Sequence, residues 1–228
     1  MTNAAGVMFI HWFSYLMIAR EAHERAVAWR EDSPSVVSGD GLVAVVFAAL
    51  SVEAFINELT EMAARSTSLS PPTENGVMTD LGRTLSEIED AKGPVELKYQ
   101  MAFKILSGTT LSPGEQPYQD FKKLVQLRND LVHLRHRDRT DDAGYVSPMS
   151  GVVRDLQQRR ITLTRGRMPG DVPGGTSWLD ELRSPEIAAW ACRAAASIIT
   201  TLGEMLPDDE DLGIAFVKQQ VSQIPDLA

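Results

Sequence analysis

The sequence predicts a mainly α-helical protein, an up-and-down helical bundle with a small irregular or β-hairpin insertion before its last long helix. Apolar residues recur at three- and four-residue steps in several long segments, and breaks rich in Pro and Gly separate those segments. With 228 residues, 43% of them apolar and 23% charged, the chain has the composition of an ordinary globular protein and can bury a core. We expect one domain over residues 1–228.

The first helix is expected from about Val7 to Trp29, because Asp32-Ser33-Pro34 then breaks the pattern. The stretch from Ala4 to Ala19 is apolar apart from His11 and Ser14, so a signal peptide and a membrane anchor have to be considered. No Lys or Arg precedes it, and it is shorter than the ~20 residues that cross a bilayer. We therefore predict a buried helix in a protein that does not enter the membrane.

The second helix is predicted from near Asp40 to about Arg65, and its apolar pattern is broad enough to place it at the centre of the fold. The segment 66–76 follows as a loop, because it contains Pro71-Pro72 and Asn75-Gly76. The predicted apolar stripe consists of Val43, Val46, Phe47, Leu50, Ala54, Leu59 and Met62, widened by Val45, Phe55 and Ile56.

Two shorter helices are predicted at about Val77–Ala91 and Val95–Leu106, with Gly93-Pro94 between them. A loop over 107–117 leads to a helix from about Tyr118 to Arg137. These elements continue the bundle, because each is long enough to present one apolar face to a neighbour.

The insertion, about residues 141–183, has no helical pattern of comparable length. Gly151–Arg154 and Ile161–Arg165 predict a short β-hairpin, since Ile161-Thr162-Leu163-Thr164 alternates apolar and polar residues. The segment 166–177 is rich in Gly and Pro and is expected to be a loop.

The closing helix is expected to begin at Ser184-Pro185-Glu186, where a Ser N-cap, a Pro at the first helical position and an early acid all favour a helix start. Pro207 and the acidic run 208–211 end it. The single cysteine, Cys192, lies in this Ala-rich helix, where core packing is favoured over a nucleophilic role. One cysteine also fits a reducing, cytoplasmic location.

Charge is distributed unevenly along the chain. The net charge is −9, which by itself disfavours a nucleic-acid partner. Residues 121–167, however, hold 11 Lys and Arg against 5 Asp and Glu, and the rest of the chain holds 11 against 26. A basic block of this kind can attract a polyanion locally, and it can equally be a solvated surface without a partner.

The helix predicted at 118–137 carries the residues with chemical potential. Its leucines at 124, 127, 131 and 134 fall on one face at 100° per residue, which makes that face the core side. Asn129 and His133 are four residues apart and would be neighbours on the helix surface. Arg128 lies on another side, but its long side chain can reach the same region.

These residues resemble a known signature. Leu127-Arg128-Asn129-Asp130-Leu131-Val132-His133 is similar to the Arg-x4–6-His motif of the HEPN superfamily, in its common Arg-Asn-x-x-x-His form. The upstream segment Ser51–Leu59, with Glu53 and Asn57 one turn apart, is similar to a segment that many HEPN proteins carry. The resemblance covers roughly residues 1–140 and 184–206, and the insertion matches nothing.

The resemblance implies a metal-independent endoribonuclease, such as a toxin or defence effector, that acts on RNA as a homodimer through the motif helix. His133 would be the acid or base and Arg128 the cation for the phosphate, while Asn129 would orient His133 or bind the phosphate. No cofactor is implied, and an antitoxin protein is a possible partner. Glu53 and Asn57 would support the catalytic residues, and the RNA backbone would be bound by Arg135, His136, Arg137 and Arg139.

Other interpretations of the same residues stay open. Arg128 can simply pair with Glu53 and tie two helices together, with Asn57 in the same network. The chain can also be a catalytically inactive HEPN module that binds RNA, nucleotide or a protein partner, or an unrelated helical protein. His133 and His136 have a spacing that suits a metal, but no third ligand is evident, so we expect no metal site.

Overall fold

The computed structural model describes residues 10–32, 38–69, 76–133, 151–159, 161, 179, 182–208 and 212–224. Within these ranges the regular structure is entirely helical, which confirms the predicted fold class. The helices are α1 (Trp12–Asp32), α2 (Asp40–Leu69), α3 (Val77–Asp90), α4 (Val95–Ser107), α5 (Tyr118–Val132), α6 (Gly151–Gln158), α8 (Pro185–Gly203) and α9 (Leu212–Ser222).

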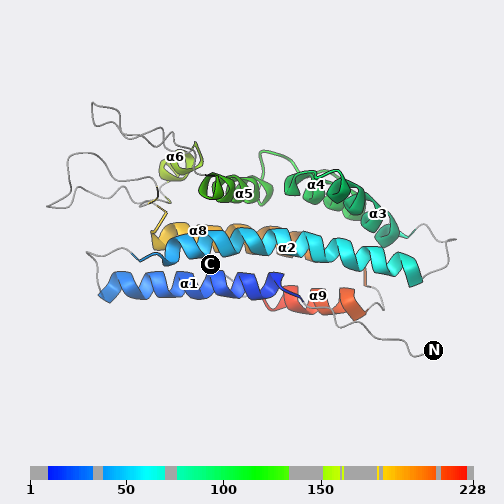
Figure 1. Ribbon diagram of the computed structural model, residues 1–228, viewed down its shortest axis with the longest axis horizontal. Helices are drawn as coiled ribbons and strands as arrows, with labels where there is room; N and C mark the ends of the chain where they lie inside the picture. Colours follow the sequence, from blue (N-terminus) through cyan, green and yellow to red (C-terminus); the bar gives the residue numbers. More distant parts are fainter. Residues whose placement is uncertain are drawn as a thin grey trace.

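The helices are arranged in three layers (Figure 1). α2 and α8 lie in the middle, α1 and α9 cover one side, and α3 to α6 cover the other. α1 and α2 run in opposite directions along most of the molecule, and α2 packs against α1, α3 and α8. One apolar core links the layers, with fully buried Trp12, Phe55, Tyr99 and Phe121 among its largest side chains.

The central position of α2 follows from its composition. Most of its surface is apolar, and among the described helices it alone is long and apolar enough to cross a membrane by length and composition. It lies between α1 and α3, and the rest of the protein buries half of its most apolar stretch. A mostly apolar helix that packs against several other helices is a central helix of the core.

The faces of α2 differ from the prediction. The fully buried side chains include Val45, Val52, Phe55 and Ile56, so the positions expected only to widen the stripe form part of the core face. Five residues of the predicted stripe instead line a half-exposed face that turns polar at Glu53 and Asn57. These five are Val43, Val46, Phe47, Leu50 and Ala54.

α1 begins later than predicted. Ile10 and His11 precede the helix, whereas the sequence pattern placed its start at Val7. The reason is a contact from another helix: the backbone N–H of His11 donates to Glu58 Oε1 of α2 at 2.7 Å. This carboxylate satisfies an N–H at the helix start and fixes the point at which the helix begins.

The first arm of the predicted β-hairpin is wrong, because Gly151–Gln158 forms the helix α6. Val152, Val153 and Leu156 are buried on one side of this helix. Their spacing suits a helical turn, although two adjacent valines also favour a strand. Ile161 is described as irregular backbone, and the rest of the second arm lies outside the described residues.

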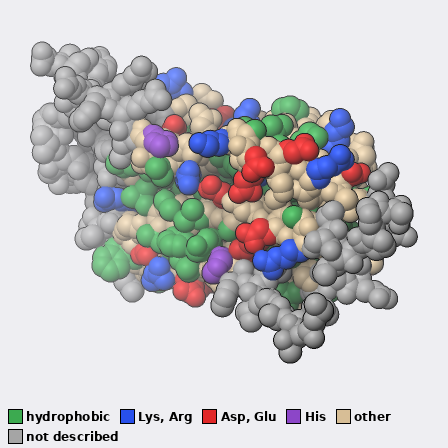
Figure 2. Space-filling view, turned by 45° about the vertical axis from the view of Figure 1, so that its right-hand side comes forward, with side chains coloured by type: hydrophobic (Ala, Val, Ile, Leu, Met, Phe, Trp, Pro, Cys, Tyr) green, Lys and Arg blue, Asp and Glu red, His purple; other side chains and the backbone are tan. Residues whose placement is uncertain are grey.

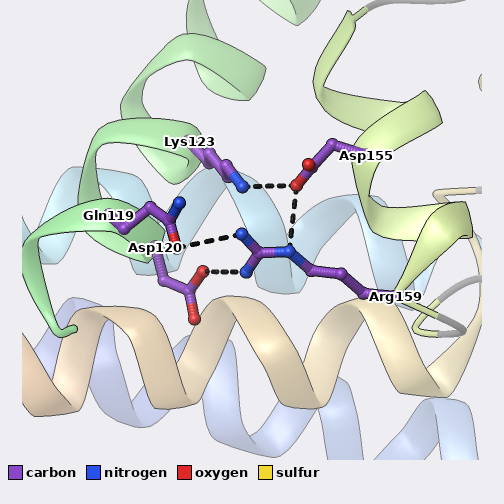
Figure 3. Close-up of polar contacts among 5 residues, drawn as sticks. All are labelled: Gln119, Asp120, Lys123, Asp155 and Arg159. Carbon is purple, nitrogen blue, oxygen red and sulfur yellow. Dashed lines mark hydrogen bonds and ion pairs between the residues drawn. The ribbon is translucent and has the colours of Figure 1, made fainter. Parts of the chain in front are cut away.

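A polar network fastens α6 to α5 (Figure 3). The guanidinium of Arg159 pairs with Asp155 at 3.1 Å and with Asp120 at 3.0 Å, and it donates to Gln119 at 3.0 Å. Lys123 of α5 pairs with Asp155 as well. All three nitrogens of the guanidinium therefore have a partner, which gives the α5–α6 contact a defined geometry.

The start of the closing helix α8 is confirmed. Ser184 is its N-cap and Pro185 its first residue, and Ser184 Oγ accepts a hydrogen bond from the Ile187 N–H at 3.2 Å. The helix α9 was not predicted. It packs on α8 so closely that a Cβ at Gly203 would lie 2.7 Å from the side chain of Val221.

Candidate functional site

The motif helix α5 ends at Val132, five residues before the predicted end at Arg137. His133 lies just beyond it with φ −109° and ψ 47°, and its N–H donates to the Asn129 carbonyl at 2.9 Å. The side chain of Val132 is 57% exposed, so the helix is leaving the core at this point and packing no longer supports another turn. His133 is exposed at the end of the helix rather than on its side.

Arg128 is held by two neighbours. Its Nη2 lies 3.2 Å from Glu53 Oε2 of α2, and its Nη1 donates to Asn129 Oδ1 at 3.0 Å. The Arg128 and Glu53 side chains are 28% and 44% exposed, so their ion pair contributes at most about 1 kcal/mol. The guanidinium is therefore positioned by contacts weak enough to be exchanged for those of a ligand.

A cleft of about 240 Å³ lies beside Arg128, where α5 and α2 meet the turn between α3 and α4. We call it the Arg128 cleft. Its polar lining consists of Glu53, Glu96, Arg128 and Asn129. The remainder is formed by Gly93 and by the apolar residues Ala49, Pro94, Val95 and Val125.

Asn57 is not part of this group. Its Oδ1 accepts a hydrogen bond from Lys98 Nζ of α4 at 2.9 Å, and the same Nζ lies 3.1 Å from Glu89 Oε2. The side chain of Lys98 is only 7% exposed, so its charge needs these partners. Glu53 and Asn57 were expected to act together, and the structure directs them to two different cations.

The basic block is partly neutralised where the structure describes it. Lys123, Arg128 and Arg159 each form an ion pair with a carboxylate. Acidic and basic side chains also lie intermixed on the face shown in Figure 2. The four residues predicted to bind the RNA backbone, Arg135, His136, Arg137 and Arg139, lie outside the described residues.

No known relative helps to assign this site. No family model matches the chain, and neither a curated protein nor a solved structure is significantly similar to it. The assignment therefore depends on the residues and their geometry alone.

Two polar residues near the site were not singled out from the sequence. Lys98 lies next to the buried Tyr99 on α4. A lysine on an apolar helix face is the sequence feature that could have identified it. Glu96 has no signal in the sequence, because only the packing of the α3–α4 turn against α5 brings it to the cleft.

Cys192 agrees with the expectation that it packs in the core. It is fully buried, and burial raises the pKa of its thiol to about 12. At neutral pH the group is a protonated thiol, which is a poor nucleophile. Within the described residues, no group of three or more His, Cys, Asp or Glu side chains is arranged to hold a metal ion.

Proposed function

We propose that this chain is a metal-independent endoribonuclease of the HEPN type, acting in the cytoplasm as a toxin or defence effector. The observation that supports it is the group formed by Arg128, Asn129 and Glu53 at the edge of the Arg128 cleft. These three residues belong to the two segments that carry the sequence resemblance, although they come from two helices far apart in the chain.

The roles follow from the chemistry of the side chains. Cleavage of RNA by its own 2′-hydroxyl needs a base, an acid and a cation for the charge on the phosphorane. His133 is exposed to solvent, and an imidazole can both accept and donate a proton, so we assign it the role of base or acid. Arg128 keeps N–H groups beyond those used for Glu53 and Asn129, and these are available to phosphate oxygens.

A homodimer completes the site in this proposal, because one chain supplies a single motif histidine and the reaction uses an acid and a base. The half-exposed apolar face of α2 and the exposed Val132 of α5 offer apolar surface for such an interface. Apolar residues that stay accessible in the monomer lose contact with water when a second copy covers them. RNA and, where the effector is held inactive, an antitoxin protein are the proposed partners.

The test is cleavage of RNA in the presence of EDTA. The wild-type protein is expected to leave 2′,3′-cyclic phosphate ends, and His133→Ala and Arg128→Ala each lower the rate by about 100-fold or more. Arg83→Ala is the matched control, because Arg83 is an exposed arginine on α3 that pairs only locally with Asp80 at 2.7 Å. Its cleavage rate should equal that of the wild type.

Circular dichroism and light scattering would show that each variant keeps its fold and its oligomeric state. Cleavage that persists in both His133→Ala and Arg128→Ala, with fold and assembly intact, contradicts the proposal. Activity that EDTA removes contradicts its metal-independent form.

The second candidate is an inactive HEPN module that binds RNA, nucleotide or a protein. The Arg128–Glu53 ion pair favours it, because the Glu53 carboxylate already binds one nitrogen of the guanidinium that a reacting phosphate would need. Binding of RNA without cleavage by the wild-type protein would support this candidate over the first.

A further inference from the structure

The Arg128 cleft contains a carboxylate that the proposed chemistry does not use. Glu96 lines the cleft and is half-buried, and it forms no hydrogen bond or ion pair with any residue that the structure describes. Glu53, by contrast, is paired with Arg128. The cleft therefore offers one carboxylate whose hydrogen-bond acceptors are unused.

The charge of the cleft indicates what it can hold. Two carboxylates and one guanidinium line it, so its net charge is negative and a phosphate inside it would be repelled. A neutral group that donates hydrogen bonds suits an unused carboxylate better. The phosphate of a bound RNA then belongs outside the cleft, on the side of Arg128 that faces solvent.

The volume and lining of the cleft suit a single ring system. Its volume of about 240 Å³ lies below the ~300 Å³ at which pockets for drug-sized ligands begin, so a single ring system fits. Ala49, Val95 and Val125 provide apolar surface against which a ring can pack, and Glu53, Glu96, Arg128 and Asn129 provide polar groups for its hydrogen bonds. Apolar walls with a few polar groups are typical of sites for small-molecule ligands.

We propose that the Arg128 cleft is a base-binding subsite that selects guanine through Glu96. This inference rests on the proposed ribonuclease function, since it assigns the base next to the phosphate at Arg128. Guanine presents two adjacent donors, N1–H and the N2 amino group, which a carboxylate accepts together. Cytosine and adenine present one amino donor beside a ring acceptor, and uracil presents one N–H between two carbonyls, so each of them places an acceptor against Glu96.

The experiment measures binding of the four nucleoside 3′-monophosphates by titration calorimetry, with no RNA cleavage involved. The wild-type protein is expected to bind guanosine 3′-monophosphate about tenfold more tightly than the uridine nucleotide. Glu96→Gln should remove this preference, because an amide has only one oxygen to accept with. Glu87→Gln is the matched control, since Glu87 is an exposed glutamate on α3 outside the cleft, and it should keep the preference.

Equal binding of all four nucleotides by the wild type overturns the inference, and so does a preference that survives Glu96→Gln. Absence of binding by every nucleotide overturns it too. The cleavage assay separates this failure from failure of the ribonuclease proposal, because RNA that is cut without preference for guanosine refutes only the subsite. RNA that is not cut at all refutes the enzyme, while nucleotide binding still decides the subsite.

Discussion

Glu58 shows how one side chain sets both a helix boundary and a pH response. Its Oε1 accepts the His11 N–H at the start of α1, while its Oε2 is buried without a hydrogen bond from any described residue. Burial raises the pKa of Glu58 above its ordinary value of 4.5, although the backbone N–H of His11 opposes that rise. The pKa of this carboxyl group is therefore higher in the folded state than in the unfolded chain.

The sign of the stability effect follows from this shift. Because the pKa of Glu58 is higher in the folded state than in the unfolded chain, the folded state binds the proton more tightly, and lowering the pH through the folded-state pKa raises the free energy of unfolding. Glu58→Gln keeps an oxygen for the His11 N–H and removes the ionisation. The free energy of unfolding of the variant minus that of the wild type should therefore be larger at pH 7 than at pH 5.

Urea denaturation at the two pH values measures this difference. The comparison with the wild type is essential because burial and the nearby charge of Arg193 lower the pKa of His23. That histidine costs stability as the pH falls below 6.5, which is the opposite trend, and its contribution cancels between the two proteins. A stability difference that does not change with pH would contradict the assignment to Glu58.

At the scale of the elements, α2 and α3 approach each other closely at Gly82. A Cβ placed on Gly82 would lie 2.6 Å from the carbonyl carbon of Ala63 and 2.7 Å from the Ala64 nitrogen. These are backbone atoms of α2, so they cannot move aside as a flexible side chain can. Only a residue without a side chain allows the two helices to pack at this distance.

Gly82→Ala should therefore lower the free energy of unfolding by about 1–3 kcal/mol, as overpacking does. Helix propensity alone predicts the opposite sign, because Ala replaces Gly inside a helix. Urea denaturation decides between them. Gly114→Ala is the control, since a Cβ there meets nothing within 4 Å and its stability should stay within about 0.5 kcal/mol of the wild type.

The contact between α5 and α6 depends on a single guanidinium. Arg159→Gln removes the contacts to Asp120, Asp155 and Gln119 and should weaken the docking of α6 by about 1 kcal/mol, because the pairs are partly exposed. Hydrogen exchange of the α6 amides should quicken several-fold, with little change in α2.

The matched control is Arg154→Gln, which changes an exposed arginine of the same helix. Its α6 amides should exchange as slowly as those of the wild type. Equal acceleration in both variants would mean that α6 responds to lost charge in general rather than to the Arg159 network.

At the scale of the whole molecule, the sequence predicted the helices better than their faces. The positions of α3, α4 and the start of α8 follow from local signals, such as Gly93-Pro94 and the Ser184 cap, and they are confirmed. α2 is apolar on nearly every side, so its pattern did not reveal which side is buried. Gly151–Arg154 was predicted to be a strand, but it forms part of α6, in which Val152, Val153 and Leu156 are buried.

The candidate site was predictable to the same degree. The contact between Arg128 and Glu53 was considered from the sequence and is present at 3.2 Å. The partner of Asn57 and the place of Glu96 were not, because both depend on how α4 crosses α2 and α5. The sequence shows which side chains share one face of a single helix. It does not show which side chains of different helices meet, because that depends on how the helices pack.

The buried thiol of Cys192 has a practical consequence for measuring assembly. Since the only cysteine of the chain is inaccessible and protonated at neutral pH, the native protein offers no background to thiol-directed probes. A cysteine introduced at the exposed Val132 would carry a spin label as a single site on each chain. Two such labels in a homodimer would report, as one interspin distance, how far apart the two α5 ends lie in solution.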